Sequence, residues 1–258
     1  MVSFSGVTKT YGKGKRAHTV VDHFSLSVKV PVFGFLGQNG AGKTTVMKMT
    51  VGLLAPSGGT ITIDGAPSGS AAAREKIGFM PETPYFYERM KGMEFLKFCH
   101  SLSGKPAREG AAHYESILRK VDIFDARDQE VGTYSKGMRQ RLGFAQALVN
   151  DPEYLFLDEP LDGLDPLGRR QMKAVILALK AEGRKIFLNT HILYDVEEIC
   201  DEVGVINGGK LLYAGKVSEF CRGKSLEERF VEMVSKEERA GRLPDLLPAE
   251  ARDQVART

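Results

Sequence analysis

Residues 31–45 read Pro31-Val-Phe-Gly-Phe-Leu-Gly-Gln-Asn-Gly-Ala-Gly-Lys-Thr-Thr45, and this stretch decides the fold. It starts with a short, continuous apolar run at 31–36, which is typical of a strand buried on both faces of a parallel sheet. Glycine-rich residues 37–42 follow, and a helical pattern runs from Lys43 to about Leu53. The order of strand, glycine-rich turn and helix predicts an α/β protein.

The eight residues from Gly37 to Thr44 match the pattern GxxxxGK[ST], in which a turn cradles phosphate groups. The glycines let the backbone curl so that several N–H groups point inward, and the helix that follows contributes its positive end. We expect the Lys43 ammonium to reach the β- and γ-phosphates of a nucleotide and the Thr44 hydroxyl to ligate Mg²⁺. The candidate nucleotide-binding residues here are Gly37, Gln38, Asn39, Gly40, Ala41, Gly42, Lys43, Thr44 and Thr45.

A second chemical motif follows the apolar run Tyr154–Leu157, which ends in Asp158 and Glu159. In α/β proteins, ligands bind at the carboxyl ends of the buried parallel strands. We expect Asp158 to hold Mg²⁺ through water and Glu159 to polarise the water that attacks the γ-phosphate. The two motifs together predict a nucleotide-hydrolysing site.

The patterns along the chain predict a main domain over residues 1–215. Its first 30 residues are expected to form strands joined by a turn, and residues 92–149 a mainly helical insertion. Short apolar runs at 154–157 and 185–188 flank a helical segment, 166–181, and this β-α-β unit implies a parallel sheet. Turn residues predict hairpins at Asp64–Gly65 and Asn207–Gly209, and further short strands are expected at 61–63, 77–80, 203–206 and 211–213.

From residue 216 the sequence becomes strongly charged, which sets residues 216–258 apart as a C-terminal extension. Ser225 and Glu228 have the spacing of a capping box, and the apolar residues that follow form one helical face. That face suits packing against the main domain, and it also suits a partner.

Composition excludes several classes of protein. A chain of 258 residues with 42% hydrophobic and 27% charged residues is neither disordered nor fibrous. The net charge of +3 gives no basic field that favours nucleic acid. Three widely spaced cysteines fit a reducing compartment. We find no apolar run long enough to span a membrane and no signal peptide, so we expect a cytosolic protein whose membrane role needs a separate partner.

Residues 134–141, Tyr-Ser-Lys-Gly-Met-Arg-Gln-Arg, narrow the choice. Here the sequence resembles the ATP-binding subunits of ABC transporters, whose signature is Leu-Ser-Gly-Gly-Gln followed by a basic helix. The chain keeps Ser135 and Gly137 and departs from the signature at Tyr134, Lys136 and Met138. The resemblance covers most of residues 2–235.

The resemblance implies roles for further residues. Tyr11 would stack on adenine, and His191 would contact the γ-phosphate. Residues 161–166 look like the family's D-loop, with Asp165 near the nucleotide. Ser135 and Gly137 would contact the γ-phosphate of ATP bound to the opposite subunit, so the resemblance implies a second ATP-binding subunit, in a homodimer or a related heterodimer.

Glu82 is a departure from the family, which usually has a glutamine near Mg²⁺ and the attacking water at this position. A glutamate there either tightens Mg²⁺ binding or repels the γ-phosphate, depending on whether the metal lies between them. Pro81-Glu82, the signature Tyr-Ser-Lys-Gly-Met and the tail residues Ser225-Leu-Glu-Glu-Arg-Phe resemble the subfamily that pairs with ABC-2-type membrane subunits, which often serve as exporters.

The resemblance implies a P-loop NTPase core with a parallel sheet, an N-terminal antiparallel β subdomain, a helical insertion and a short C-terminal helical tail. It implies an ATPase that uses ATP and Mg²⁺. The ATPase would lie at the cytoplasmic face of a membrane and power transport, in the direction of export, through a separate polytopic permease. The aromatic-rich segment 83–92 is the expected contact for the permease, and a packed surface loop is the alternative. The alternative functions are a soluble ABC-type ATPase acting on nucleic acid or ribosomes, and a regulatory nucleotide-binding module.

Overall fold

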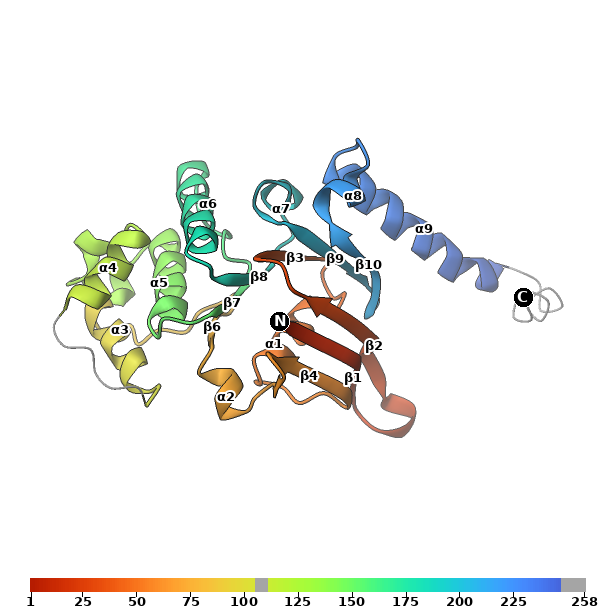
Figure 1. The fold of residues 1–258 in the computed structure, drawn as a ribbon, viewed down its shortest axis with the longest axis horizontal. Coiled ribbons are helices and arrows are strands. Elements are labelled where there is room, and N and C mark those ends of the chain that lie inside the picture. Colours follow the sequence, from red (N-terminus) through yellow and green to blue (C-terminus); the bar gives the residue numbers. More distant parts are fainter. Residues whose placement is uncertain (105–110, 247–258) are drawn as a thin grey trace.

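The computed structural model describes residues 1–104 and 111–246, drawn in colour in Figure 1. The strands are β1 (Val2–Tyr11), β2 (His18–Val28), β3 (Val32–Leu36), β4 (Gly58–Ile63), β5 (Ala66–Pro67), β6 (Ile77–Met80), β7 (Tyr154–Asp158), β8 (Lys185–Asn189), β9 (Glu202–Asn207) and β10 (Lys210–Lys216). The α-helices are α1 (Lys43–Thr50), α2 (Ala71–Arg74), α3 (Gly92–Ser101), α4 (Ala112–Lys120), α5 (Lys136–Leu148), α6 (Pro166–Ala181), α7 (Leu193–Ile199), α8 (Val217–Cys221) and α9 (Leu226–Leu246). Short 3₁₀ turns lie at Gly14–Arg16, Phe124–Ala126 and Val131–Thr133.

The central sheet has the strand order β10-β9-β3-β8-β7-β6 within the described residues. Strands β6, β7, β8, β3 and β9 run parallel, and β10 pairs antiparallel with β9. The predicted β-α-β unit is confirmed, because β7 and β8 are parallel neighbours joined by α6 over the expected residues 166–181. All five residues of β3 and of β7 are buried, which explains their uninterrupted apolar sequence.

A second, antiparallel sheet is built mainly from the N-terminal residues, in the order β2-β1-β4-β5. The predicted hairpin at Asp64–Gly65 is confirmed, since Ile63 pairs with Ala66 across it. Residues 207–210 form the second predicted hairpin, between β9 and β10. Helix α1 is shorter than expected and ends at Thr50, because Gly52, with φ +75°, turns the chain out of the helix.

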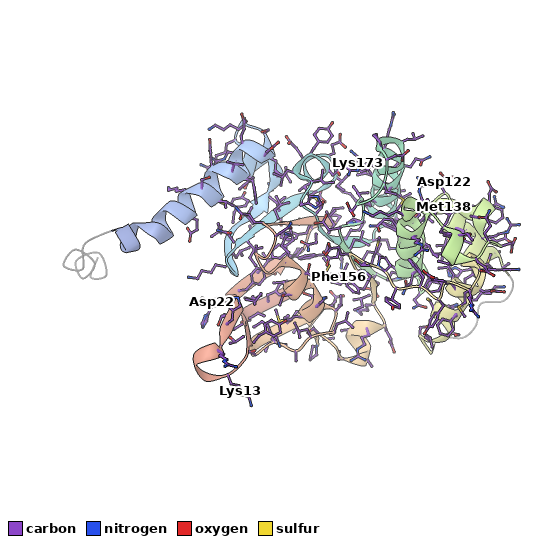
Figure 2. All side chains as sticks on the ribbon, turned by 180° about the vertical axis from the view of Figure 1, so that it is seen from behind. Lys13, Asp22, Asp122, Met138, Phe156 and Lys173 are labelled. Atoms are coloured by element: carbon purple, nitrogen blue, oxygen red, sulfur yellow. The ribbon has the colours of Figure 1, made fainter. Side chains whose placement is uncertain are left out.

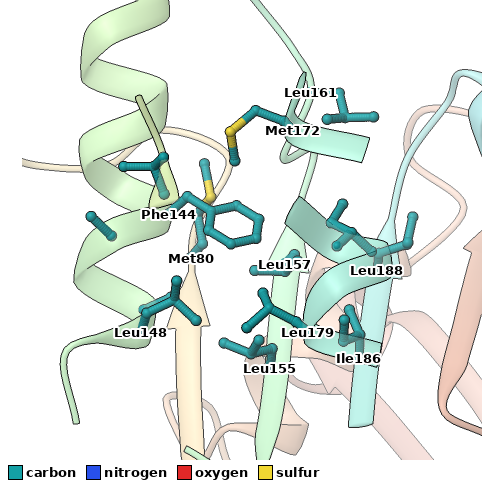
Figure 3. Close-up of a cluster of buried hydrophobic side chains, with 14 of the residues drawn as sticks. Met80, Phe144, Leu148, Leu155, Leu157, Leu161, Met172, Leu179, Ile186 and Leu188 are labelled. Carbon is teal, nitrogen blue, oxygen red and sulfur yellow. The ribbon is translucent and has the colours of Figure 1, made fainter. Parts of the chain in front are cut away.

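The main hydrophobic core lies between the central sheet and helices α5 and α6. Figure 3 shows Phe144 and Leu148 of α5 and Leu179 of α6 facing the side chains of β6, β7 and β8. Phe156 of β7 points to the other face of the sheet and joins the core beneath the antiparallel sheet. Figure 2 shows Phe156 near the middle of the molecule. The parallel sheet is therefore covered on both faces, and in α/β proteins of this kind ligands bind at the carboxyl ends of the strands.

The segment between β6 and β7 is helical where it is described, with α3, α4 and α5 gathered at one end of the molecule (Figure 1). Figure 2 places Met138 of α5 toward that end and Lys13, in the turn after β1, at the lower edge of the view. Residues 105–110 of the expected helical insertion and residues 247–258 of the expected C-terminal extension lie outside the described residues.

Helix α9 starts with the capping box expected from the sequence. The Ser225 N–H donates to the Glu228 carboxylate (2.9 Å), and the Glu228 N–H donates to the Ser225 hydroxyl (3.2 Å). Leu226 and Val234 are buried, and the helix contacts α7 and α8, so its first half packs against the main domain. Over the ranges that the structure describes, each helix is too short or too polar to cross a membrane.

Candidate functional site

Residues 37–45 form a tight turn between the carboxyl end of β3 and the start of α1. Gly42 has φ +107°, and a Cβ at this position would lie 2.9 Å from the Val20 carbonyl oxygen. A Cβ at Gly37 would lie 2.5 Å from the carbonyl oxygen of Ile206. Both positions therefore require glycine, because the neighbouring backbone leaves no room for a side chain.

Two other parts of the chain hold this turn in place through backbone hydrogen bonds. The Gly209 N–H, in the β9–β10 hairpin, donates to the Ala41 carbonyl (3.1 Å). The Asp22 N–H, in β2, donates in turn to the Gly209 carbonyl (3.0 Å). The turn is thus fixed between the two sheets before any ligand binds.

Lys43 lies at the start of α1 with its side chain folded over the turn. Its Nζ donates to the carbonyl oxygens of Gly37 (2.6 Å) and Gln38 (3.0 Å), and only 7% of the residue is exposed. Burial lowers the pKa of the Lys43 ammonium, while the carboxylates of Glu159, Asp158 and Glu82 oppose that shift. A buried ammonium beside inward-facing backbone N–H groups is suited to a polyanion.

A cavity of about 380 Å³ opens beside the turn. It brings together residues from both predicted motifs, although more than a hundred positions separate them in the sequence. Its lining comprises Val20, Asn39, Gly40, Gly42, Lys43, Thr44, Thr45, Glu82, Asp158, Glu159, Asn189 and His191. The shape is large enough for the phosphate chain of a nucleotide.

Asp158 ends β7 with 2% of its surface exposed. Burial raises the pKa of this carboxyl, and hydrogen bonds from Asn189 and Thr44 oppose the rise. The Asn189 amide donates from Nδ2 to Asp158 Oδ1 (2.7 Å). Because a carboxylate only accepts, this bond fixes the orientation of the amide.

The Thr44 hydroxyl and the Asp158 carboxylate form a pair of hard oxygen donors beside the turn. Mg²⁺ binds such pairs together with phosphate oxygens and water, so the residues present fit the expected metal. Among the described side chains, no three His, Cys, Asp or Glu residues gather as a metal cage, and Mg²⁺ here would need a nucleotide to complete its shell.

Glu159 follows Asp158 and has φ +51°, which is unusual for a residue with a Cβ. Its Oε2 accepts a hydrogen bond from the His191 backbone N–H (3.4 Å) and lies 2.9 Å from His191 Nδ1. The second oxygen of Glu159 is left for another donor, such as a water in the cavity.

Other residues predicted for the site lie outside the lining of this cavity. Ser135 caps α5, accepting from the Met138 N–H (3.2 Å), and Asp165 caps α6, accepting from the Gly168 N–H (2.8 Å). Gly137 lies against residues 163–164, since a Cβ there would be 3.5 Å from Leu164 Cδ2. Tyr11 ends β1 with 44% of its surface exposed, and the Lys9 ammonium lies 5.1 Å from its ring centre.

Two described residues line the cavity without having been predicted, Val20 and Asn189. Asn189 ends β8, beside the end of β7. Ligands bind at the carboxyl ends of parallel strands, so the strand order places Asn189 at the site together with Asp158. Val20 comes from β2, and only the three-dimensional contact between the sheets brings it to the turn.

Fold and cavity together define an α/β nucleotide-binding protein of the phosphate-loop type. Residues 22–162 match the model of the family described as ABC transporter. An ABC transporter ATP-binding protein of Nostoc is 46% identical over 189 residues, which are 72% of this chain and 56% of that protein. A fluoroquinolones export ATP-binding protein of Mycobacterium tuberculosis is 40% identical, over 87% of this chain and 74% of that protein. A bacitracin transport ATP-binding protein of Enterococcus faecalis is 37% identical, over 85% of this chain and 70% of that protein.

A solved structure described as the ATP binding subunit of an ABC transporter superposes with a TM-score of 0.79 and 29% identity, covering 91% of this chain and 99% of that one. The chain belongs to the ABC transporter family of ATP-binding proteins. It spans between about half and three quarters of the length of these curated relatives.

Proposed function

We propose that this chain binds and hydrolyses ATP to power transport through a separate membrane permease, in the direction of export. The observation that carries the proposal is the single cavity that joins the Lys43 turn to the carboxylates of Asp158 and Glu159. The family match supports it, and so do the relatives named for bacitracin transport and fluoroquinolones export.

In the proposed reaction, water attacks the γ-phosphorus of ATP, the bond to the β–γ bridging oxygen breaks, and ADP and phosphate leave. Lys43 and the backbone N–H groups of the turn hold the β- and γ-phosphates. Thr44 and Asp158 would hold Mg²⁺, which supplies neutralising charge on the phosphates when bound. We assign Glu82 to the edge of the same metal and phosphate site.

Glu159 is the proposed base. One carboxylate oxygen is occupied by His191, so the other is the acceptor for the proton of the attacking water. His191 is held by the same contact with its Nε2 edge free to meet the γ-phosphate. The contact with Glu159 gives a role to His191, a half-exposed residue that follows β8 and lines the cavity.

We further propose that two ATP-binding subunits close face to face. Ser135 is exposed, and neither Ser135 nor Gly137 is among the residues that line this chain's own cavity. The exposed amino end of a helix of that length favours an anion nearby, and ATP bound to a second subunit would supply one. In this arrangement Ser135, Gly137 and Asp165 belong to the interface, and Tyr11 would stack on adenine.

The segment 83–92 is the proposed contact for the permease. Tyr85 is 93% exposed and Tyr87 60% exposed, and large exposed aromatics mark protein interfaces. The segment is also bonded to the chain just before the signature residues 134–141, because the Gly132 N–H donates to the Glu88 carbonyl (2.8 Å). The permease would thus hold the chain at the cytoplasmic face of the membrane.

Co-purification tests this proposal. The tagged full chain is expressed at native level, membranes are solubilised in mild detergent, and the captured proteins are identified and assayed for ATPase activity. A polytopic membrane protein in stoichiometric amount, together with ATPase activity, is the expected result. Recovery with ribosomes or DNA and no membrane protein would contradict the transport assignment and leave only the ATPase chemistry.

A further inference from the structure

Gln140 lies in the second turn of α5, in the middle of the molecule rather than at its surface. Only 6% of the residue is exposed. Its Nε2 donates a hydrogen bond of 2.7 Å to the main-chain carbonyl oxygen of Glu159. Because a carbonyl only accepts, the NH₂ end of the amide must face Glu159. A side chain of the signature helix is therefore bonded to the backbone of the proposed base.

The backbone of Glu159 needs support of this kind. Its φ of +51° lies in the left-handed region, where the Cβ crowds the following carbonyl. Such a conformation persists only where the surroundings fix it. The Glu159 N–H donates to the Asn189 carbonyl (2.8 Å), and the Glu159 carbonyl accepts from Gln140. The residue is thus held on one side by β8 and on the other by α5.

We propose that Gln140 is a positioning residue for ATP hydrolysis. By fixing the left-handed backbone of Glu159, it keeps one carboxylate oxygen on His191 and the other available to the attacking water. Gln140 is not among the residues that line the cavity, so its proposed effect reaches the reaction through Glu159. The inference rests on the proposed function, in which Glu159 is the base.

The same bond links two parts of the proposed machinery. Ser135 caps the helix that carries Gln140, and the two residues are little more than one turn apart. A second contact joins the amino end of α5 to the segment after Glu159: the Lys136 ammonium forms an ion pair with the Asp162 carboxylate (2.9 Å). Because a helix moves as a rigid element, a shift of Ser135 on a second subunit's nucleotide would be transmitted to the Glu159 carbonyl.

The test compares the full-length wild type with Q140M, which keeps the length of the side chain and removes its donor. We expect kcat for ATP hydrolysis to fall about tenfold, or ~1.4 kcal/mol in activation free energy. The KM for ATP and the affinity for ADP should stay within about twofold, because the phosphate turn is untouched. Q146M, at a half-buried glutamine of the same helix, is the matched control and should keep the wild-type kcat.

Q140H is the rescue variant, since an imidazole Nε2–H can donate from a similar place. It should keep kcat within about threefold of wild type. A wild-type kcat in Q140M overturns the inference, and so does a Q140H no better than Q140M or a loss of ADP affinity that matches the loss of kcat. If Q140M does not fold, a tenfold loss in a folded Q140H overturns it as well. A wild type without ATPase activity would instead refute the proposed function.

Discussion

Residues 37–45 and residues 135–141 each contain glycine and include the first turn of a helix, yet their surroundings are opposite. At the first turn, Gly42 and Lys43 are buried, and the turn is hydrogen-bonded to the β9–β10 hairpin and lines a cavity with three carboxylates. At the second, Ser135 and Lys136 are exposed and lie outside the lining of that cavity. The difference teaches that one motif is completed within the chain, and it fits our proposal that the other meets a ligand on a second subunit.

The largest effect is expected from a variant that removes the proposed base, Glu159, and leaves both turns intact. Glu159→Gln keeps the size of the side chain and removes its ability to accept a proton. We expect kcat to fall by about a hundredfold or more, while ATP binding and ATP-dependent dimerisation persist. Steady-state ATPase rates and size-exclusion chromatography with ATP measure the two effects, and wild-type turnover would remove Glu159 as the base.

The next test acts on the first turn alone. Lys43→Ala removes the buried ammonium, and we expect nucleotide affinity to fall about a hundredfold, the equivalent of ~3 kcal/mol for a charge-assisted hydrogen bond. Titration with a fluorescent ATP analogue measures it. Lys48→Ala is the control, because Lys48 is exposed on the same helix. Unchanged affinity in Lys43→Ala would contradict the assignment of the phosphate turn.

A third test acts on the second turn alone. Ser135→Asp keeps an oxygen that can cap α5 but adds a negative charge where a partner's γ-phosphate is proposed. We expect ATP-dependent dimerisation to weaken about tenfold or more, with nucleotide affinity of the monomer unchanged. Ser70→Asp is the matched control, since Ser70 caps α2 with the same 3.2 Å hydrogen bond. Equal dimerisation in both variants would refute the interface role of Ser135.

The smallest effect concerns Glu82, the acid at the rim of the cavity. It raises the pKa of Asp158 electrostatically, as a nearby negative charge must, and the same charge attracts a cation. We expect Glu82→Gln to raise the Mg²⁺ concentration for half-maximal ATPase activity about threefold. The effect is small because Glu82 is exposed, and solvent weakens the attraction of an exposed charge. Glu75→Gln, at another exposed glutamate, is the control. A fall in the required Mg²⁺ would mean that Glu82 repels the γ-phosphate instead.

The sequence predicted the local features of the fold well, because each depends on neighbouring residues. The phosphate turn, helix 166–181 and the hairpin at Asp64–Gly65 are all coded within a few positions. The contacts of Gln140 and the cavity lining of Val20 and Asn189 were missed, since they arise where distant segments meet. A buried glutamine in a helix carries no signal of its own until the strand beneath it is known.

The β9–β10 hairpin has a consequence for anyone who modifies this protein. In the sequence, Asn207-Gly-Gly-Lys210 has the composition of a surface turn at which a tag or a fluorophore is commonly inserted. In the fold, its Gly209 backbone is the clamp between Ala41 and Asp22. An insertion at this hairpin would displace residues 37–45, the proposed nucleotide-binding turn, from more than 160 residues away, so labels belong elsewhere on the molecule.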